Sequence, residues 1–172
     1  PSDISLANAE LGLAARLGRE TVLRRALAPV AGDYDAVVLD CAPSLGVLTV
    51  NALTAAQGVL IPTLAEAMAL RGLRLFLASL DQVRDALNPE LRIIGVLVTF
   101  FDPRLIHHRD ALAAMQAGGL PLLPVTVGRS VKVAEAAGLG ESIITYAASN
   151  PQARAYRELG KVIEQWLKGE RL

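Results

Sequence analysis

The chain has 172 residues, of which 17 are Lys or Arg and 17 are Asp or Glu, so its formal net charge at neutral pH is zero. Apolar residues make up 52% of it, too large a share for a disordered segment, and they predict a packed globular domain. A single cysteine excludes a disulfide framework, and 4% aromatic residues argue against a stacking platform for single-stranded nucleic acid. No apolar run reaches the roughly 18 to 20 residues that cross a bilayer, so we expect a soluble protein without membrane association. The lone cysteine indicates a reducing, cytoplasmic setting.

Short runs of Val, Ile and Leu alternate along the chain with longer stretches of helical spacing. Residues 5–29 have a helical period that we expect to break near Gly18. Buried strands are predicted at residues 36–40, 59–62, 92–99 and 122–127, with helices in the intervals. This alternation predicts a single α/β domain over residues 1–172, with a doubly wound, mainly parallel sheet and helices on both faces.

The last helix has the clearest boundary. Asn150 suits its N-cap and Pro151 its first position. We expect its apolar face to be formed by Tyr156, Leu159, Ile163, Trp166 and Leu167.

Residues 34–46 carry the most informative pattern: four apolar residues lead to Asp40, and a Pro43-Ser44-Leu45-Gly46 turn follows. In an open α/β sheet such a carboxylate stands at the carboxyl end of a strand, where ligands bind. A Walker-B aspartate occupies this kind of position because a magnesium ion on a nucleotide needs a fixed anionic group. The structural alternative is that Asp40 only caps the turn after it.

Further blocks follow this one in order along the chain. They are Asn51-Ala52-Leu53, Glu66 with Ala69-Leu70 and Gly72-Leu73, residues 95–104 (GVLVTFFDPR), residues 129–136 (RSVKVAEA), and Ala153 with Tyr156. On these blocks, nearly the whole chain resembles the ParA/Soj family of chromosome and plasmid partitioning ATPases, members of the deviant-Walker P-loop class.

The resemblance implies a three-layer P-loop NTPase fold that works as an ATP-dependent switch. ATP and Mg²⁺ would be its cofactors, and ATP binding would form a homodimer that binds DNA without sequence preference and so associates with the nucleoid. A partner of the ParB/Spo0J type would stimulate hydrolysis and release the DNA.

The resemblance also assigns roles to residues. Asp40 would be the catalytic and metal-binding carboxylate. Other cofactor-binding positions would be Pro43, Ser44, Gly46, Thr99, Phe101, Asp102, Gly128, Arg129 and Ser130. The cations expected to contact DNA are Arg104, Arg109, Arg129, Lys132, Arg154 and Arg157. The alternative for each of them is an ordinary solvated position on the protein surface.

The sequence also departs from the family pattern. It contains no GxxxxGK[ST] loop, so it resembles the C-terminal two thirds of such an ATPase, and we expect this chain alone neither to bind nor to hydrolyse ATP. Gly128 stands where the family has Pro, Ser130 where it has Asn, and Leu64 where it has Gln.

Two other functions fit the same residues. One is a non-enzymatic interaction module that keeps the fold without the phosphate loop. The other is a MinD-like positioning ATPase, which residues 161–172 would attach to a membrane; we expect that segment to pack on the sheet instead.

Three side chains could suggest a metal site or a nucleophile, but the sequence supports neither. His107 and His108 are adjacent and cannot chelate one metal ion from a helix, so we expect them at the surface or at a dimer face. Cys41 has no identifiable base beside it and is expected to be a small buried residue.

Overall fold

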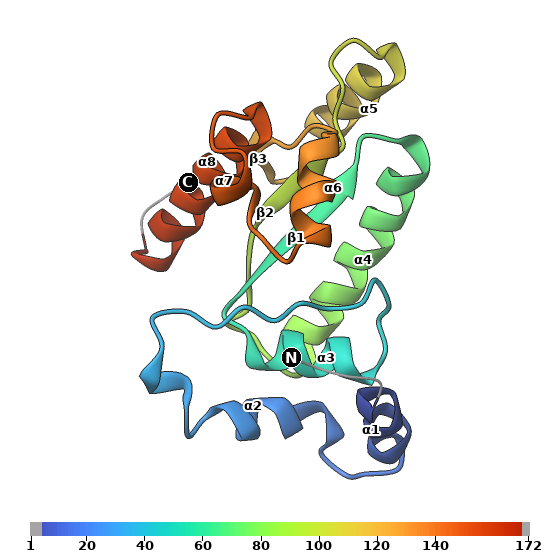
Figure 1. Cartoon of the computed structure of the whole chain (residues 1–172). Coiled ribbons are helices and arrows are strands. Elements are labelled where there is room, and N and C mark those ends of the chain that lie inside the picture. Colours follow the sequence, from blue (N-terminus) through green and yellow to red (C-terminus); the bar gives the residue numbers. More distant parts are fainter. Residues whose placement is uncertain (1–4, 170–172) are drawn as a thin grey trace. The chain divides into compact units, whose positions relative to one another are not determined.

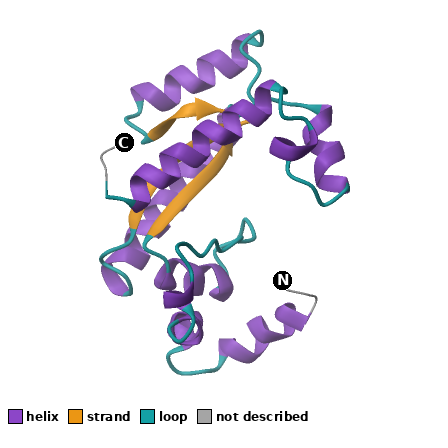
Figure 2. Ribbon diagram, turned by 60° about the vertical axis from the view of Figure 1, so that its left-hand side comes forward, coloured by secondary structure: helices purple, strands orange, loops and turns teal. Residues whose placement is uncertain are grey.

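The computed structural model describes residues 5–169, which form two compact units (Figures 1 and 2). The first contains the residues up to Val59 together with Leu75–Arg92, and the second contains Leu60–Arg74 together with the residues from Ile93 onward. Among the described residues, no helix is both long and apolar enough to span a bilayer.

The first unit is built from short helices. They are α1 (Ser5–Ala14), the 3-10 turn η1 (Arg19–Thr21), α2 (Val22–Leu27), the 3-10 turn η2 (Ala31–Asp33), α3 (Val47–Ala55) and the later part of α4 (Ala67–Ala86). The expected break near Gly18 is confirmed, because Gly18 has a left-handed φ of 68° between α1 and η1. Glycine adopts that conformation without the steric cost that a side chain would bring.

Asn51 on α3 holds this unit together. Its side chain is 3% exposed, and its Oδ1 accepts a hydrogen bond of 3.0 Å from the backbone N–H of Leu23. Its Nδ2 donates to the carbonyl oxygens of Arg19, at 2.7 Å, and Val47, at 2.8 Å. One buried amide therefore joins η1 and α2 to α3, which explains the polar side chain in an otherwise apolar helix.

The strand predicted at residues 36–40 is wrong for the described chain. This segment is irregular, and the side chains of Val37 and Val38 are 47% and 91% exposed. A β-strand needs a neighbour to pair its N–H and C=O groups, and none of the strands among residues 5–169 pairs with this one. The apolar pattern is right for a strand, but no neighbouring strand is there to stabilise it.

The other three predicted strands are confirmed, as β1 (Gly58–Leu64), β2 (Arg92–Thr99) and β3 (Leu122–Thr126), in the order β1-β2-β3. β2 and β3 are parallel, with Val96 opposite Leu122 and Val98 opposite Thr126, so the register is irregular between these pairs. β1 and β2 also have adjacent carboxyl ends, because the Thr99 hydroxyl donates to the Thr63 carbonyl at 3.0 Å.

Helices cover both faces of this sheet in the second unit. On one face Leu97 and Leu123 pack against Leu159 and Val162 of α8 (Pro151–Leu167). On the other face Val98 packs with Met115 and its neighbours on α5 (Ile106–Ala117). Because successive side chains of a strand point to opposite faces, this alternation gives the expected doubly wound α/β fold (Figure 2).

The last helix begins as predicted. The Asn150 Oδ1 accepts from the Gln152 N–H at 2.8 Å, and Pro151 is the first helical residue. The expected apolar face is partly wrong, because Leu167 is 49% exposed whereas the smaller Ala153 and Val162 are buried. Two short helices, α6 (Val131–Gly138) and α7 (Ile143–Tyr146), precede it, and residues 170–172 of the predicted closing segment lie outside the described residues.

Asn51→Ala is expected to lower the free energy of unfolding by about 2 to 4 kcal/mol, because it removes three partly buried hydrogen bonds. Urea denaturation followed by circular dichroism measures the change. The matched control is Gln57→Ala, which removes an exposed amide and should shift stability by less than about 0.5 kcal/mol. Equal effects of the two substitutions would contradict the role given to Asn51.

Candidate functional site

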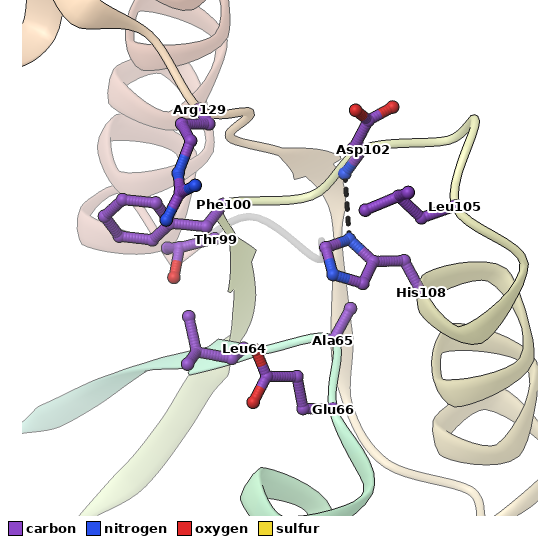
Figure 3. A pocket seen from close by; sticks show the side chains of 9 residues that line it. All are labelled: Leu64, Ala65, Glu66, Thr99, Phe100, Asp102, Leu105, His108 and Arg129. Atoms are coloured by element: carbon purple, nitrogen blue, oxygen red, sulfur yellow. Dashed lines mark hydrogen bonds between the residues drawn. The ribbon is translucent and has the colours of Figure 1, made fainter.

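A cavity of about 400 Å³ lies in the second unit where β1 and β2 end (Figure 3). Its walls come from the residues after β1, from the loop after β2 and the start of α5, and from the loop after β3. They are Leu64, Ala65, Glu66, Thr99, Phe100, Asp102, Leu105, His108 and Arg129. Parallel α/β sheets bind their ligands at this edge, so the cavity is the candidate site.

Phe100 is the most unusual residue of the cavity. Its φ of 53° is the only left-handed value outside glycine in the described part of the chain, and its side chain is 55% exposed. The Arg129 guanidinium lies 5.9 Å from the centre of its ring. A bulky residue in this conformation is strained, and strain of this kind concentrates at functional sites. Phe100 was not among the predicted site residues, because nothing in the residue pattern marks this backbone conformation.

Asp102 forms an ion pair with Arg104, two residues later in the same loop. Its carboxylate accepts from the Arg104 Nε at 3.0 Å and from Nη2 at 2.7 Å, and also from the Arg104 backbone N–H at 3.0 Å. These bonds lower the pKa of the Asp102 carboxyl to about 2. Figure 3 shows the carboxylate directed away from the other cavity residues. Asp102 thus contributes its backbone to the cavity wall, and Arg104 directs its charge to a partner within its own loop.

His108, which was expected with His107 at the surface or at a dimer face, lines the cavity. It is half-buried, and its Nδ1 accepts a hydrogen bond of 3.1 Å from the backbone N–H of Asp102. His107 is exposed, and its ring meets that of His108 edge-on at 4.6 Å. No group of three or more His, Cys, Asp or Glu side chains suited to a metal ion occurs within the described residues.

The loop after β3 is tied to the start of α8. The Gly128 N–H donates to Gln152 Oε1 at 2.6 Å, and the Asn150 Nδ2 donates to the Ser130 hydroxyl at 3.4 Å. A Cβ on residue 128 would come within 2.9 Å of Gln152 Nε2 and 3.1 Å of the Phe101 carbonyl. Proline at this position would lack the N–H that bonds to Gln152 and would fill that space, so glycine is what permits the contact. No motif in the sequence marks Gln152.

Lys132 belongs to a small ionic cluster. Its ammonium lies 2.8 Å from Glu135 Oε2, to which the Tyr146 hydroxyl also donates at 3.0 Å. The bonds to Glu135 raise the pKa of both Lys132 and Tyr146, and the bond from Lys132 lowers the pKa of Glu135. Arg157 donates to the carbonyl oxygens of Ala148, at 2.9 Å, and Ile144, at 3.3 Å. With Arg104, three of the expected DNA-contacting cations thus have partners inside the chain.

The Asp40 group lies in the first unit, whereas the cavity lies in the second. Asp40, Pro43 and Ser44 are exposed, and Gly46 is the residue before α3. Cys41 is exposed rather than buried, and it follows the irregular segment where a strand was predicted at residues 36–40. Partial desolvation and the neighbouring Asp40 carboxylate raise the pKa of its thiol, which disfavours the reactive thiolate.

Three comparisons with known proteins bear on this site. A family model described as an AAA domain matches residues 1–93. An uncharacterized protein of Mycobacterium tuberculosis is 44% identical over 162 residues, which cover 94% of this chain and 51% of that protein. The chromosome-partitioning ATPase Soj of Thermus thermophilus is 41% identical over 164 residues, which cover 95% of this chain and 64% of Soj.

A solved structure is similar over the whole chain. The crystal structure named cobyrinic acid a,c-diamide synthase from Mycobacterium smegmatis has a TM-score of 0.84 at 38% identity and covers 100% of this chain and 64% of that one. A second structure of that protein contains ADP and magnesium.

The fold and these similarities define the class as P-loop NTPase-like α/β proteins. The chain belongs to the AAA domain family. Its resemblance to the ParA/Soj proteins, seen in the sequence, is confirmed by the 41% identity to Soj. The chain spans between about half and two thirds of the length of these relatives, 51% of the mycobacterial protein and 64% of Soj.

Arg104→Gln is expected to move the pKa of the Asp102 carboxyl from about 2 back toward the ordinary value of about 4, because its hydrogen bonds to the guanidinium are removed. Carboxyl ¹³C NMR at about pH 3 should then show Asp102 ionised in the parent and mainly protonated in the variant. The pKa is lower in the folded state, so any stability from this exposed pair is present above about pH 4 and is lost as the pH falls through about 2. Identical titration midpoints in parent and variant would contradict the assignment.

Proposed function

We propose that this chain is the C-terminal part of a ParA-type DNA-segregation ATPase that binds ATP and Mg²⁺ in its full-length form. The observation that carries the proposal is the cavity where β1 and β2 end. Its polar lining residues Glu66, Thr99, Asp102 and Arg129 come from the same blocks that resemble the family. The names of the relatives support it, since Soj is called a chromosome-partitioning ATPase and the M. smegmatis protein was solved with ADP and magnesium.

The cavity suits the base of a nucleotide. Its volume of about 400 Å³ is in the range of small-molecule sites, and Leu64 and Leu105 supply apolar walls. The exposed Phe100 ring and the Arg129 guanidinium offer flat surfaces on which an aromatic base can stack. The 172 residues contain no GxxxxGK[ST] loop, so the N–H groups that hold the phosphates are not among them.

Asp40 suits the magnesium ion by its chemistry. A carboxylate oxygen is a ligand that Mg²⁺ prefers, and the exposed Asp40 side chain is free of the described ion pairs. Bound Mg²⁺ would neutralise charge on the phosphates, while Asp40 would hold it directly or through water. Pro43, Ser44 and Gly46 would form the turn that responds to the phosphates.

The test of this function uses the full-length protein encoded by the gene. A fluorescent ATP analogue is titrated with and without Mg²⁺, and dimerisation is followed by light scattering. Binding that needs Mg²⁺, and a dimer that forms only with ATP, support the partitioning ATPase and justify a search for a ParB/Spo0J-type partner and for nucleoid association. Absence of nucleotide binding favours the non-enzymatic module, and vesicle binding that depends on residues 161–172 favours a MinD-like protein.

Asp40→Ala in the full-length protein is expected to reduce Mg²⁺-dependent ATP turnover by at least about 100-fold, because the metal loses a fixed ligand. Its thermal midpoint should stay within about 2 °C of the parent, since the exposed side chain makes no described contact that supports the fold. Asp35→Ala, which removes a nearby exposed carboxylate, is the control and should keep its turnover. Equal turnover in Asp40→Ala and the parent would refute the metal-binding role.

DNA is the proposed macromolecular ligand, and the described contacts rank the candidate cations. Arg104, Lys132 and Arg157 have partners within the chain, as described above. Arg109 and Arg154 are exposed and form no ion pair with a described residue, and Arg129 lies over Phe100. An exposed pair such as Lys132–Glu135 stabilises little, so a phosphate can replace the carboxylate at small cost.

Replacing both Arg129 and Lys132 by Ala in the full-length protein is expected to weaken binding to nonspecific duplex DNA. The slope of log K against log salt should fall by about 1 for each phosphate that the protein no longer neutralises. Fluorescence anisotropy between low and moderate salt measures both effects. The double replacement of Arg24 and Arg25 by Ala removes the same charge from α2 and serves as the control. An unchanged salt slope in the variant that lacks Arg129 and Lys132 would place the DNA-binding surface elsewhere.

A further inference from the structure

His108 is held in one orientation within the cavity. Its Nδ1 accepts from the Asp102 N–H at 3.1 Å, and the Phe101 ring stacks beside it with 6.1 Å between ring centroids and 26° between planes. His107 meets it edge-on. The hydrogen bond and the two rings together fix the imidazole before any ligand arrives.

The same hydrogen bond determines which nitrogen carries the proton. Nδ1 accepts a bond, so in the neutral ring it has no hydrogen, and the hydrogen lies on Nε2. Figure 3 shows the Nε2 edge of the ring on the side of the other lining residues, and no described side chain or carbonyl pairs with it. His108 thus offers the cavity a hydrogen-bond donor in a fixed place.

The other walls indicate what accepts this bond. The Phe100 ring and the Arg129 guanidinium are planar groups, and Leu64 and Leu105 are apolar. A flat heteroaromatic ring with an unprotonated ring nitrogen matches this lining. It stacks on the planar groups, displaces water from the apolar walls and accepts a hydrogen bond from the His108 N–H.

We propose that His108 is a specificity-determining residue of the cavity, whose Nε2–H donates to N1 or N7 of the bound purine base. The proposal rests on the proposed nucleotide-binding function and adds to it the residue that recognises the base. Asp102 is then a positioning residue, since its backbone N–H selects the tautomer of His108.

The test combines three protein variants with three nucleotides, using the full-length protein. His108→Leu removes the donor, His108→Gln keeps a donor on a side chain of similar reach, and His107→Leu is the matched control on the exposed neighbour. Binding of ATP, 1-deaza-ATP and 7-deaza-ATP is measured by calorimetry. Each deaza analogue replaces one acceptor nitrogen of the purine by carbon.

In the parent, one of the two analogues is expected to bind about 3- to 10-fold more weakly than ATP, the effect of removing one hydrogen bond. His108→Leu should bind ATP more weakly by a similar factor and should not distinguish ATP from that analogue, because the donor is already gone. His108→Gln should recover part of the discrimination, and His107→Leu should keep all of it. A merely structural role of His108 would weaken all three nucleotides equally.

Three results would overturn the inference. If ATP binds to the parent but both analogues bind equally well, or if His108→Leu discriminates as the parent does, His108 does not recognise the base and the proposed function stands without it. If the parent binds no nucleotide, the proposed function fails and this inference fails with it.

Discussion

The second unit depends on burial of the central strand β2 on both of its faces. Val96, Leu97 and Val98 are at most 4% exposed, with Leu97 under α8 and Val98 under α5. A shift of one residue along the strand would exchange these faces and break both packing layers at once. The end of β2 at Thr99 is therefore fixed in space, and the cavity takes its position from that end.

The loop after β2 carries this rigidity into the site. Asp102 uses its carboxylate to bind Arg104 and its backbone N–H to orient His108, so one residue organises both sides of the turn. Thr99 in turn joins the end of β2 to β1. The strained backbone of Phe100 persists between these two anchors because its neighbours on either side cannot relax.

The sequence was sufficient where local signals and tertiary packing agree. The run of apolar residues in β2 and the Asn150-Pro151 start of α8 each predicted an element that the structure contains, and the block pattern predicted the family. Residues 36–40 have the same apolar character as β2, but a strand also needs a neighbouring strand with which to form hydrogen bonds. The residues of the segment itself do not predict whether such a strand is present.

The site was predicted only in part, for a physical reason of the same kind. Thr99, Phe101, Asp102 and residues 128–130 were predicted. The contribution of His108, however, depends on a hydrogen bond to Asp102, six positions earlier in the sequence, and that of Gln152 on a contact with Gly128 far away in the sequence. Helical spacing predicts the relative direction of the His107 and His108 side chains, but it does not predict which of them contacts the loop after β2. Phe100 was missed because strain is a property of the backbone and leaves no trace in residue type.

The exposed Val37 and Val38 have a consequence for handling the protein. An extended apolar stretch that pairs with no described strand is a template for another chain, and at high concentration such stretches pair between molecules and lead to aggregation. Asp35 and Asp40 flank the stretch with negative charge, and charged flanks of this kind oppose stacking by mutual repulsion.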